Sequence, residues 1–134
     1  MLELKLFVGA LISLLCIDGI WLGLIAKNWY QQTMGPLMKT QVNWLAVLAF
    51  YLIYSFGLVY LIQLPALKNH STALQVAFNG FVLGFIAYGT YDLTNLAILK
   101  NWPVFISFVD MVWGGLLTAT VCWLVFYFFI ARVQ

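Results

Sequence analysis

Residues 104–131 read VFISFVDMVWGGLLTATVCWLVFYFFIA, and this stretch contains a single charged side chain, Asp110. An α-helix rises about 1.5 Å per residue, so about 20 apolar residues cross the roughly 30 Å hydrocarbon core of a bilayer. The stretch exceeds that minimum and is too apolar to form a helix surrounded by water. It therefore predicts a transmembrane helix over residues 104–131.

Three further apolar stretches precede it, over residues 6–26, 44–64 and 74–99. Of the 134 residues, 65% are hydrophobic and 7% are charged, whereas a soluble domain carries about 25% charged residues. The longest connection, Lys27–Asn43, contains a turn-forming Met34-Gly35-Pro36 sequence, and the other two connections are short. Because short connections favour antiparallel neighbours, we predict one all-α integral membrane domain over residues 1–134, a four-transmembrane-helix up-down bundle.

The basic side chains divide evenly between the two ends of the predicted bundle. One end carries Lys5, Lys68 and Arg132, and the other carries Lys27, Lys39 and Lys100. Cytoplasmic loops carry an excess of Lys and Arg, so this balance leaves the orientation open. The N-terminal amine and His70 favour cytoplasmic termini slightly. The net charge of +2 and the lack of a basic run argue against a nucleic-acid partner.

The two cysteines, Cys16 and Cys122, lie within apolar stretches at depths that differ by about 13 Å. A disulfide requires Cα atoms within about 7 Å of each other, so we predict two free, buried thiols. Their spacing from the only histidine, His70, does not resemble a zinc site. No cofactor is predicted.

Three of the four acidic residues lie inside predicted spans. Asp18 lies eight residues before the end of the first stretch, Asp92 seven before the end of the third, and Asp110 seven after Pro103. Each is therefore about 10–12 Å inside the hydrocarbon edge. In an up-down bundle these three edges belong to the same membrane face. A carboxyl group at this depth is costly, which makes each aspartate a candidate for a functional site.

Small and polar residues follow helical spacing beside these aspartates. The third stretch carries Gly80, Gly84, Tyr88, Asp92 and Asn95, the fourth carries Ser107, Asp110, Gly114 and Thr118, and the first carries Gly19 and Gly23. Small residues let helices approach closely and polar residues bond across the contact, so these faces are predicted to point into the bundle. The second stretch contributes Tyr51 and Tyr54 near the same depth. Trp21 and Trp113 each follow an aspartate by three residues, and each could line the site or donate its indole N–H.

Two interpretations of the three aspartates remain open. They could hydrogen-bond to Tyr, Thr, Asn and Trp side chains and hold the helices together. Alternatively, they could line a pocket that binds protons and a small polar or cationic ligand, since no Lys or Arg lies within a span to neutralise them. Three carboxyl groups at one depth favour the second interpretation. No metal site is predicted, and if a metal bound, Asp18, Asp92 and Asp110 would be its ligands.

Several blocks of the sequence resemble a bacterial family of small predicted membrane proteins of unknown function, domain of unknown function 2177. The most specific block is Tyr88-Gly-Thr-Tyr-Asp-Leu-Thr-Asn-Leu-Ala97, followed by Trp102-Pro103. Similar blocks surround Asp18, Trp44 and Asp110, so the resemblance covers nearly the whole chain and includes all three aspartates. It implies a bacterial inner-membrane protein and implies no activity.

The sequence thus favours a binding or transport protein of the bilayer, expected to assemble as a homodimer because a four-helix bundle has little room for a pore. The alternative is a membrane-embedded enzyme that modifies a lipid or isoprenoid. The spans contain no histidine cluster and no obvious nucleophile–base pair, which argues against an enzyme. A structural or accessory subunit is the second alternative. The sequence names neither the ligand nor the partner.

Overall fold

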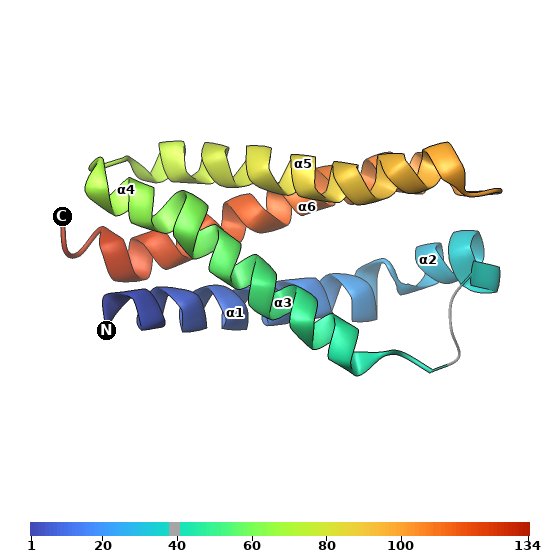
Figure 1. Cartoon of the computed structure of the whole chain (residues 1–134), viewed down its shortest axis with the longest axis horizontal. Coiled ribbons are helices and arrows are strands. Elements are labelled where there is room, and N and C mark those ends of the chain that lie inside the picture. Colours follow the sequence, from blue (N-terminus) through green and yellow to red (C-terminus); the bar gives the residue numbers. More distant parts are fainter. Residues whose placement is uncertain (38–40) are drawn as a thin grey trace.

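The computed structural model describes residues 1–37 and 41–134, and this part of the chain contains helices and no strand (Figure 1). Its elements are α1 (Leu2–Ile20), η1 (Trp21–Ile25), α2 (Lys27–Met34), η2 (Gly35–Leu37), α3 (Trp44–Leu58), η3 (Val59–Gln63), α4 (Leu64–Lys68), α5 (Ala73–Ile98), α6 (Val104–Val125) and η4 (Phe126–Ile130). Elements η1, η3 and η4 are π-helical turns that continue an α-helix, and η2 is a 3₁₀ turn. The all-α prediction is confirmed.

Four helices are long and apolar enough to cross a membrane: Leu2–Ile25, Trp44–Lys68, Ala73–Ile98 and Val104–Ile130. They match the four predicted stretches, and both termini lie at the same end of the bundle, as an up-down arrangement requires (Figure 1). The second span continues past Pro65, where the sequence suggested that it stops. Pro65 is the second residue of α4, which directly follows the π-helical turn η3, so the proline stands where the regular α-helical hydrogen bonding is already interrupted.

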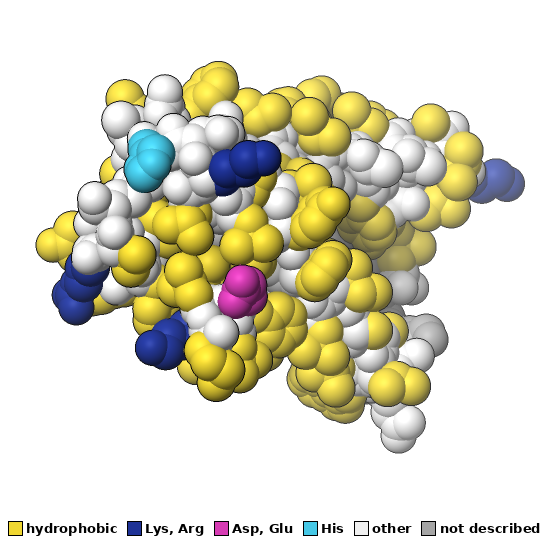
Figure 2. Space-filling model, turned by 60° about the vertical axis from the view of Figure 1, so that its left-hand side comes forward, with side chains coloured by type: hydrophobic (Ala, Val, Ile, Leu, Met, Phe, Trp, Pro, Cys, Tyr) yellow, Lys and Arg dark blue, Asp and Glu magenta, His cyan; other side chains and the backbone are white. Residues whose placement is uncertain are grey.

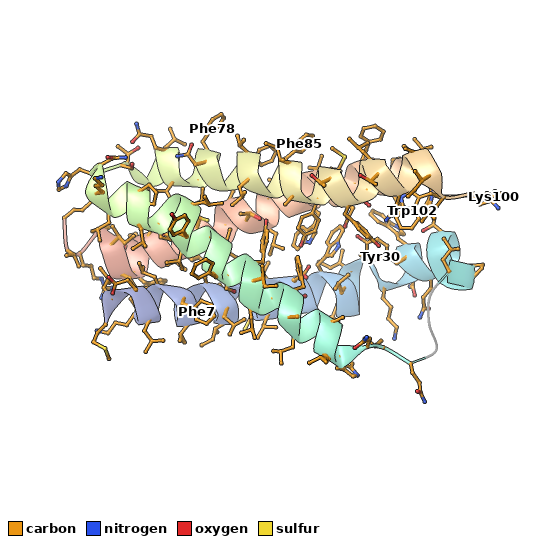
Figure 3. The ribbon with its side chains drawn as sticks, in the orientation of Figure 1. Phe7, Tyr30, Phe78, Phe85, Lys100 and Trp102 are labelled. Carbon is orange, nitrogen blue, oxygen red and sulfur yellow. The ribbon has the colours of Figure 1, made fainter. Side chains whose placement is uncertain are left out.

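The outer surface of the bundle matches a lipid environment. Hydrophobic side chains are spread widely over the face shown in Figure 2, with only a few Lys and Arg side chains among them. Phe78 and Phe85 point away from α5 and are exposed (Figure 3). In a bilayer, exposure of this kind means contact with lipid. Lys39, one of the six basic residues that left the orientation open, lies outside the described residues.

Helices α5 and α6 form the closest pair in the bundle, joined by a short corner that ends at Pro103, the N-cap of α6. Gly84 and Gly114 are both buried where the two helices meet. A Cβ atom on Gly84 would overlap the carbonyl oxygen of Gly114, and one on Gly114 would overlap the ring of Tyr88. The predicted small-residue faces of these two spans therefore do point into the bundle.

Helix α1 packs along a narrower line. Its buried residues are Leu6, Ala10, Leu14 and Asp18, spaced four apart. Gly19 and Gly23 are exposed and have open space around them, so the prediction that they face the interior is wrong. The reason is geometric: Gly19 follows Asp18 directly, and neighbouring residues on a helix point about 100° apart.

The cysteine prediction is confirmed in one part and wrong in another. Both thiols are free, as their different depths indicated. Cys122 is buried, but Cys16 is exposed because it lies two residues from both Leu14 and Asp18 and so points away from their packing line. Hydrophobicity alone could not reveal this, since a lipid-facing and a core-facing residue are equally apolar.

Candidate functional site

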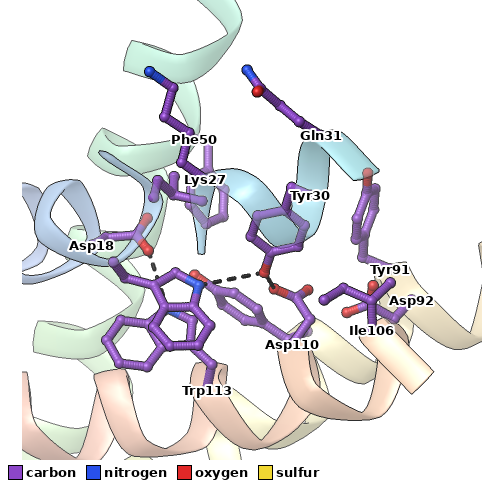
Figure 4. Close-up of a pocket in the computed structure, with 13 residues that line it drawn as sticks. Asp18, Lys27, Tyr30, Gln31, Phe50, Tyr91, Asp92, Ile106, Asp110 and Trp113 are labelled. Carbon is purple, nitrogen blue, oxygen red and sulfur yellow. Dashed lines mark hydrogen bonds between the residues drawn. The ribbon is translucent and has the colours of Figure 1, made fainter. Parts of the chain in front are cut away.

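A cavity of about 540 Å³ lies at the end of the bundle where the first span leads into α2 (Figure 4). All three intramembrane aspartates line it, together with Lys27 and Gln31 of α2. Its aromatic walls are Trp21, Tyr30, Phe50, Tyr88, Tyr91 and Trp113. We call it the aspartate cavity. The three carboxyl groups have different surroundings, which we describe in turn.

Asp18 is held by hydrogen bonds from two other spans. The Tyr51 hydroxyl on α3 donates to its Oδ2 at 2.5 Å, and the Trp113 indole N–H on α6 donates to its Oδ1 at 3.2 Å. Its side chain is 5% exposed. With both oxygens bonded, Asp18 links three of the four spans, which agrees with the interpretation that an aspartate holds the helices together.

Asp110 is bonded to a residue outside the spans. The Tyr30 hydroxyl on α2 donates to Asp110 Oδ1 at 2.8 Å and accepts a longer bond, 3.4 Å, from the Trp21 indole N–H. The Tyr30 ring packs with Ala26 and Ile106 in a small buried cluster. Helix α2 therefore continues beyond the first span, contacts α6 through Tyr30 and closes one side of the cavity (Figure 3).

Asp92 is the least satisfied of the three. Its side chain is 3% exposed, and its Oδ2 has no hydrogen-bond partner among the residues that the structure describes. Its carboxyl group lies next to that of Asp110 in the cavity (Figure 4). A buried polar atom without a partner costs about 1–3 kcal/mol, so this oxygen calls for a ligand or a proton.

Trp21 and Trp113 form one wall of the cavity. Their rings stack with centroids 4.4 Å apart and planes at 11° to each other. Each indole N–H donates on the cavity side, to Tyr30 and to Asp18 respectively. We predicted that each tryptophan would line the site or donate its indole N–H. Each tryptophan does both.

The remaining predicted site residues are placed differently. Tyr88 lines the cavity, and Tyr51 reaches it through its bond to Asp18. Tyr54 instead bonds the Thr118 hydroxyl at 2.6 Å, between α3 and α6. Asn95 is half-buried and is not among the residues that line the cavity. It lies nearly a full turn beyond Asp92, closer to the end of α5.

The sequence reasoning missed the cavity residues of α2, Lys27, Tyr30 and Gln31, because it treated Lys27–Asn43 as a connection. It also missed four cavity residues within the spans: Leu22, Phe50, Tyr91 and Ile106. The available signal was the pair Ala26 and Tyr30, whose spacing of four places both on one face of a helix. Lys27 lies just beyond the first span. The observed spans do include Lys5 and Lys68, but both lie near the span ends at the opposite end of the bundle from the aspartates. Within residues 1–37 and 41–134, no lysine or arginine forms an ion pair with the three aspartates.

Comparison with known proteins identifies the family. The family model described as "Predicted membrane protein (DUF2177)" matches residues 3–127. The chain belongs to this family. No curated protein and no solved structure matches it. The DUF2177 match covers all three aspartates, both stacked tryptophans and Tyr30, so the whole cavity lies within the family's shared region.

The aspartates of this DUF2177 protein are not arranged as a metal site. Over the described part of the chain, no three His, Cys, Asp or Glu residues could hold one ion. The carboxyl groups divide instead into Asp18, which is fully bonded, and the neighbouring pair Asp92 and Asp110. The suggestion that the three aspartates would be the ligands of any bound metal is therefore not supported by their geometry.

The bond from Tyr30 to Asp110 predicts an alkaline loss of stability. Burial, and then the negative charge of Asp110, raises the pKa of Tyr30 above its ordinary value of 10.0. The folded state thus retains the phenolic proton more tightly than the unfolded state, so this contribution is complete below the unfolded pKa and decreases as pH rises above it. The unfolding temperature of the wild type should fall more steeply above about pH 10 than that of Tyr30→Phe. Tyr60→Phe, which alters an exposed tyrosine, should behave as the wild type, and equal slopes in all three proteins would contradict the prediction.

Proposed function

We propose that the aspartate cavity binds a small organic ammonium ion and that this ion exchanges with a proton shared by Asp92 and Asp110. The observation that carries the proposal is the unpartnered, buried oxygen of Asp92 beside a second carboxyl group. Two adjacent carboxylates in a low-dielectric site cannot both ionise cheaply, so a proton or another cation must accompany them. An ammonium group supplies both the positive charge and the missing hydrogen-bond donor.

The aromatic walls support an organic cation over a bare metal ion. Indole and phenol rings attract cations to their faces, by about 0.5–2 kcal/mol each. Trp21, Tyr30, Tyr88 and Trp113 all line the cavity that holds the carboxyl pair. Carboxylates combined with aromatic faces are the chemistry that recognises alkylated amines.

Exchange with a proton gives a binding reaction that depends on pH. Protons compete with the ammonium ion for the carboxyl pair, so the affinity should rise as pH increases. If the exchange were coupled to opening at the opposite face, the protein would transport the amine. Transport through so small a bundle would need a homodimer, and that assembly remains a prediction. The location in a bacterial inner membrane and the cytoplasmic position of the termini also remain predictions.

Titration of the purified protein with butylammonium, followed by tryptophan fluorescence, tests the proposal. Binding should perturb the emission of Trp21 and Trp113, and Asp92→Asn should weaken it about tenfold or more, because a charge-assisted hydrogen bond contributes about 1.5–3 kcal/mol. Glu3→Gln is the matched control, since Glu3 is an exposed acidic residue outside the cavity, and it should bind as the wild type does. An unchanged affinity in Asp92→Asn, or no pH dependence in the wild type, would contradict the proposal.

A further inference from the structure

The wall formed by Trp21 and Trp113 has a second side. There, the two tryptophans join Trp29 and four exposed α6 residues, Phe105, Phe108, Val112 and Leu116, around a groove of about 460 Å³. We call this the lipid-facing groove. It runs along the first half of α6, from the membrane edge inward, and its lining is almost wholly apolar. The same two rings therefore separate a carboxylate site from a surface suited to hydrocarbon.

The charges of the aspartate cavity are also arranged in order of depth. Asp92 lies six residues before the end of α5 and Asp110 six residues after the start of α6, so both are about 9 Å inside the span ends. Lys27 lines the same cavity but begins α2, beyond the end of the first span. The cavity thus has negative charge at its base, from the aspartates, and positive charge at its rim, from Lys27. The side-chain amide of Gln31 lies beside Lys27 at this rim (Figure 4).

We propose that the ligand is a membrane lipid with a phosphoethanolamine headgroup, which straddles the Trp21–Trp113 wall. This inference rests on the proposed function, because the lipid's ammonium group is the cation at Asp92 and Asp110. The phosphate lies at Lys27, and an acyl chain occupies the lipid-facing groove. The headgroup therefore folds inward behind the wall, while the chain descends along α6 in front of it.

Three simpler ligands each leave one part of the site without a matching group. A free amine would leave Lys27 without a counter-charge at the rim. An anionic lipid would place no cation beside the unpartnered oxygen of Asp92. A purely apolar ligand would fill the groove and leave the carboxyl pair unmatched. Only an amphiphile that carries an ammonium group next to a phosphate satisfies the base, the rim and the groove together.

Native mass spectrometry of the delipidated, detergent-solubilised protein can measure the affinities directly. Phosphatidylethanolamine should bind about tenfold more tightly than phosphatidylglycerol, whose headgroup lacks the ammonium group. Glycerophosphoethanolamine, which has the headgroup but no acyl chains, should bind at least about tenfold more weakly than the lipid. Lys27→Gln should lose about tenfold in affinity for phosphatidylethanolamine. It should bind butylammonium at least as tightly as the wild type, because the substitution removes a like charge from the cavity.

Lys100→Gln is the matched control, since Lys100 is an exposed lysine near the same membrane face and does not line the cavity. It should bind both probes as the wild type does. If butylammonium binds but phosphatidylglycerol equals phosphatidylethanolamine, or Lys27→Gln equals the wild type, the lipid assignment is wrong and the amine site stands. If glycerophosphoethanolamine binds as tightly as the lipid, the groove is not used and the assignment is also overturned. If neither butylammonium nor the lipid binds, the proposed function fails as well.

Discussion

Replacing Gly84 with alanine should lower the free energy of unfolding by about 2–3 kcal/mol, because the added Cβ atom meets the backbone of α6. The nearest atom is the carbonyl oxygen of Gly114, followed by the Thr118 hydroxyl. Neither can withdraw as the tip of a flexible side chain could, so α5 and α6 must separate. Loss of this contact weakens the pair of helices that carries Asp92 and Asp110.

The measurement is reversible unfolding in mixed micelles, compared with Gly57→Ala. Gly57 also lies inside a transmembrane helix, but a Cβ atom there meets nothing within 4 Å. That substitution should be neutral or stabilise the helix by about 0.5–1 kcal/mol, because glycine is the poorer helix former. If the two variants were equally stable, the close approach of α5 and α6 would be refuted.

Replacing Asp18 with leucine should cost about 3 kcal/mol of folding stability. The substitution leaves the Tyr51 hydroxyl and the Trp113 indole N–H without their shared acceptor, and each orphaned buried donor costs about 1–3 kcal/mol. Asp18→Asn keeps an acceptor oxygen at the same place, so its cost should be about 1 kcal/mol. The same unfolding assay measures both variants.

A double-mutant cycle with Tyr51→Phe separates the lost bonds from a general packing defect. Removing both partners of a hydrogen bond costs much less than removing one, because no donor is left unpaired. The double variant Asp18→Leu/Tyr51→Phe should therefore be more stable than the sum of the single effects implies. Simple additivity would show that the bond from Tyr51 to Asp18 contributes nothing.

The fold could be predicted because lipid imposes one strong rule on the sequence. Backbone groups in hydrocarbon must bond within the chain, so each long apolar stretch becomes a helix. The inward faces of α5 and α6 were also readable, since their polar and small residues coincide at helical spacing. Gly80, Gly84 and Gly114 are buried accordingly.

The same reasoning was wrong for α1, where polarity and size point in different directions. Asp18 is buried, but Gly19 and Gly23 beside it are exposed, and so is Cys16. A glycine faces lipid or protein at little difference in energy, because lipid chains and side chains are similarly apolar. The carboxyl group of Asp18 was therefore the only dependable marker of the inward face of this helix.

The sequence predicted the depth of the site in the membrane but not the contacts that its residues make. Counting residues from the span ends brought Asp18, Asp92 and Asp110 to one level, and all three line one cavity. Asp18 is hydrogen-bonded on both oxygens, whereas Asp92 and Asp110 form a carboxyl pair. This difference depends on which hydrogen-bond donors reach each aspartate. One of those donors, Tyr30, lies on the short amphipathic helix α2, whose eight residues are too few for hydrophobic periodicity to identify.

The bonds of Asp18 also fix an order of events during synthesis. A chain emerges N-terminal end first, so the span that carries Asp18 enters the membrane before either of its partners exists. Tyr51 arrives with the second span, and Trp113 arrives only with the fourth. Asp18 therefore has neither of its native donors until the second span arrives, and its Oδ1 lacks the Trp113 bond until the fourth span arrives. Insertion of α6 is thus the step that commits the earlier helices to their native partners, and a chain interrupted before it cannot assemble the cavity at all.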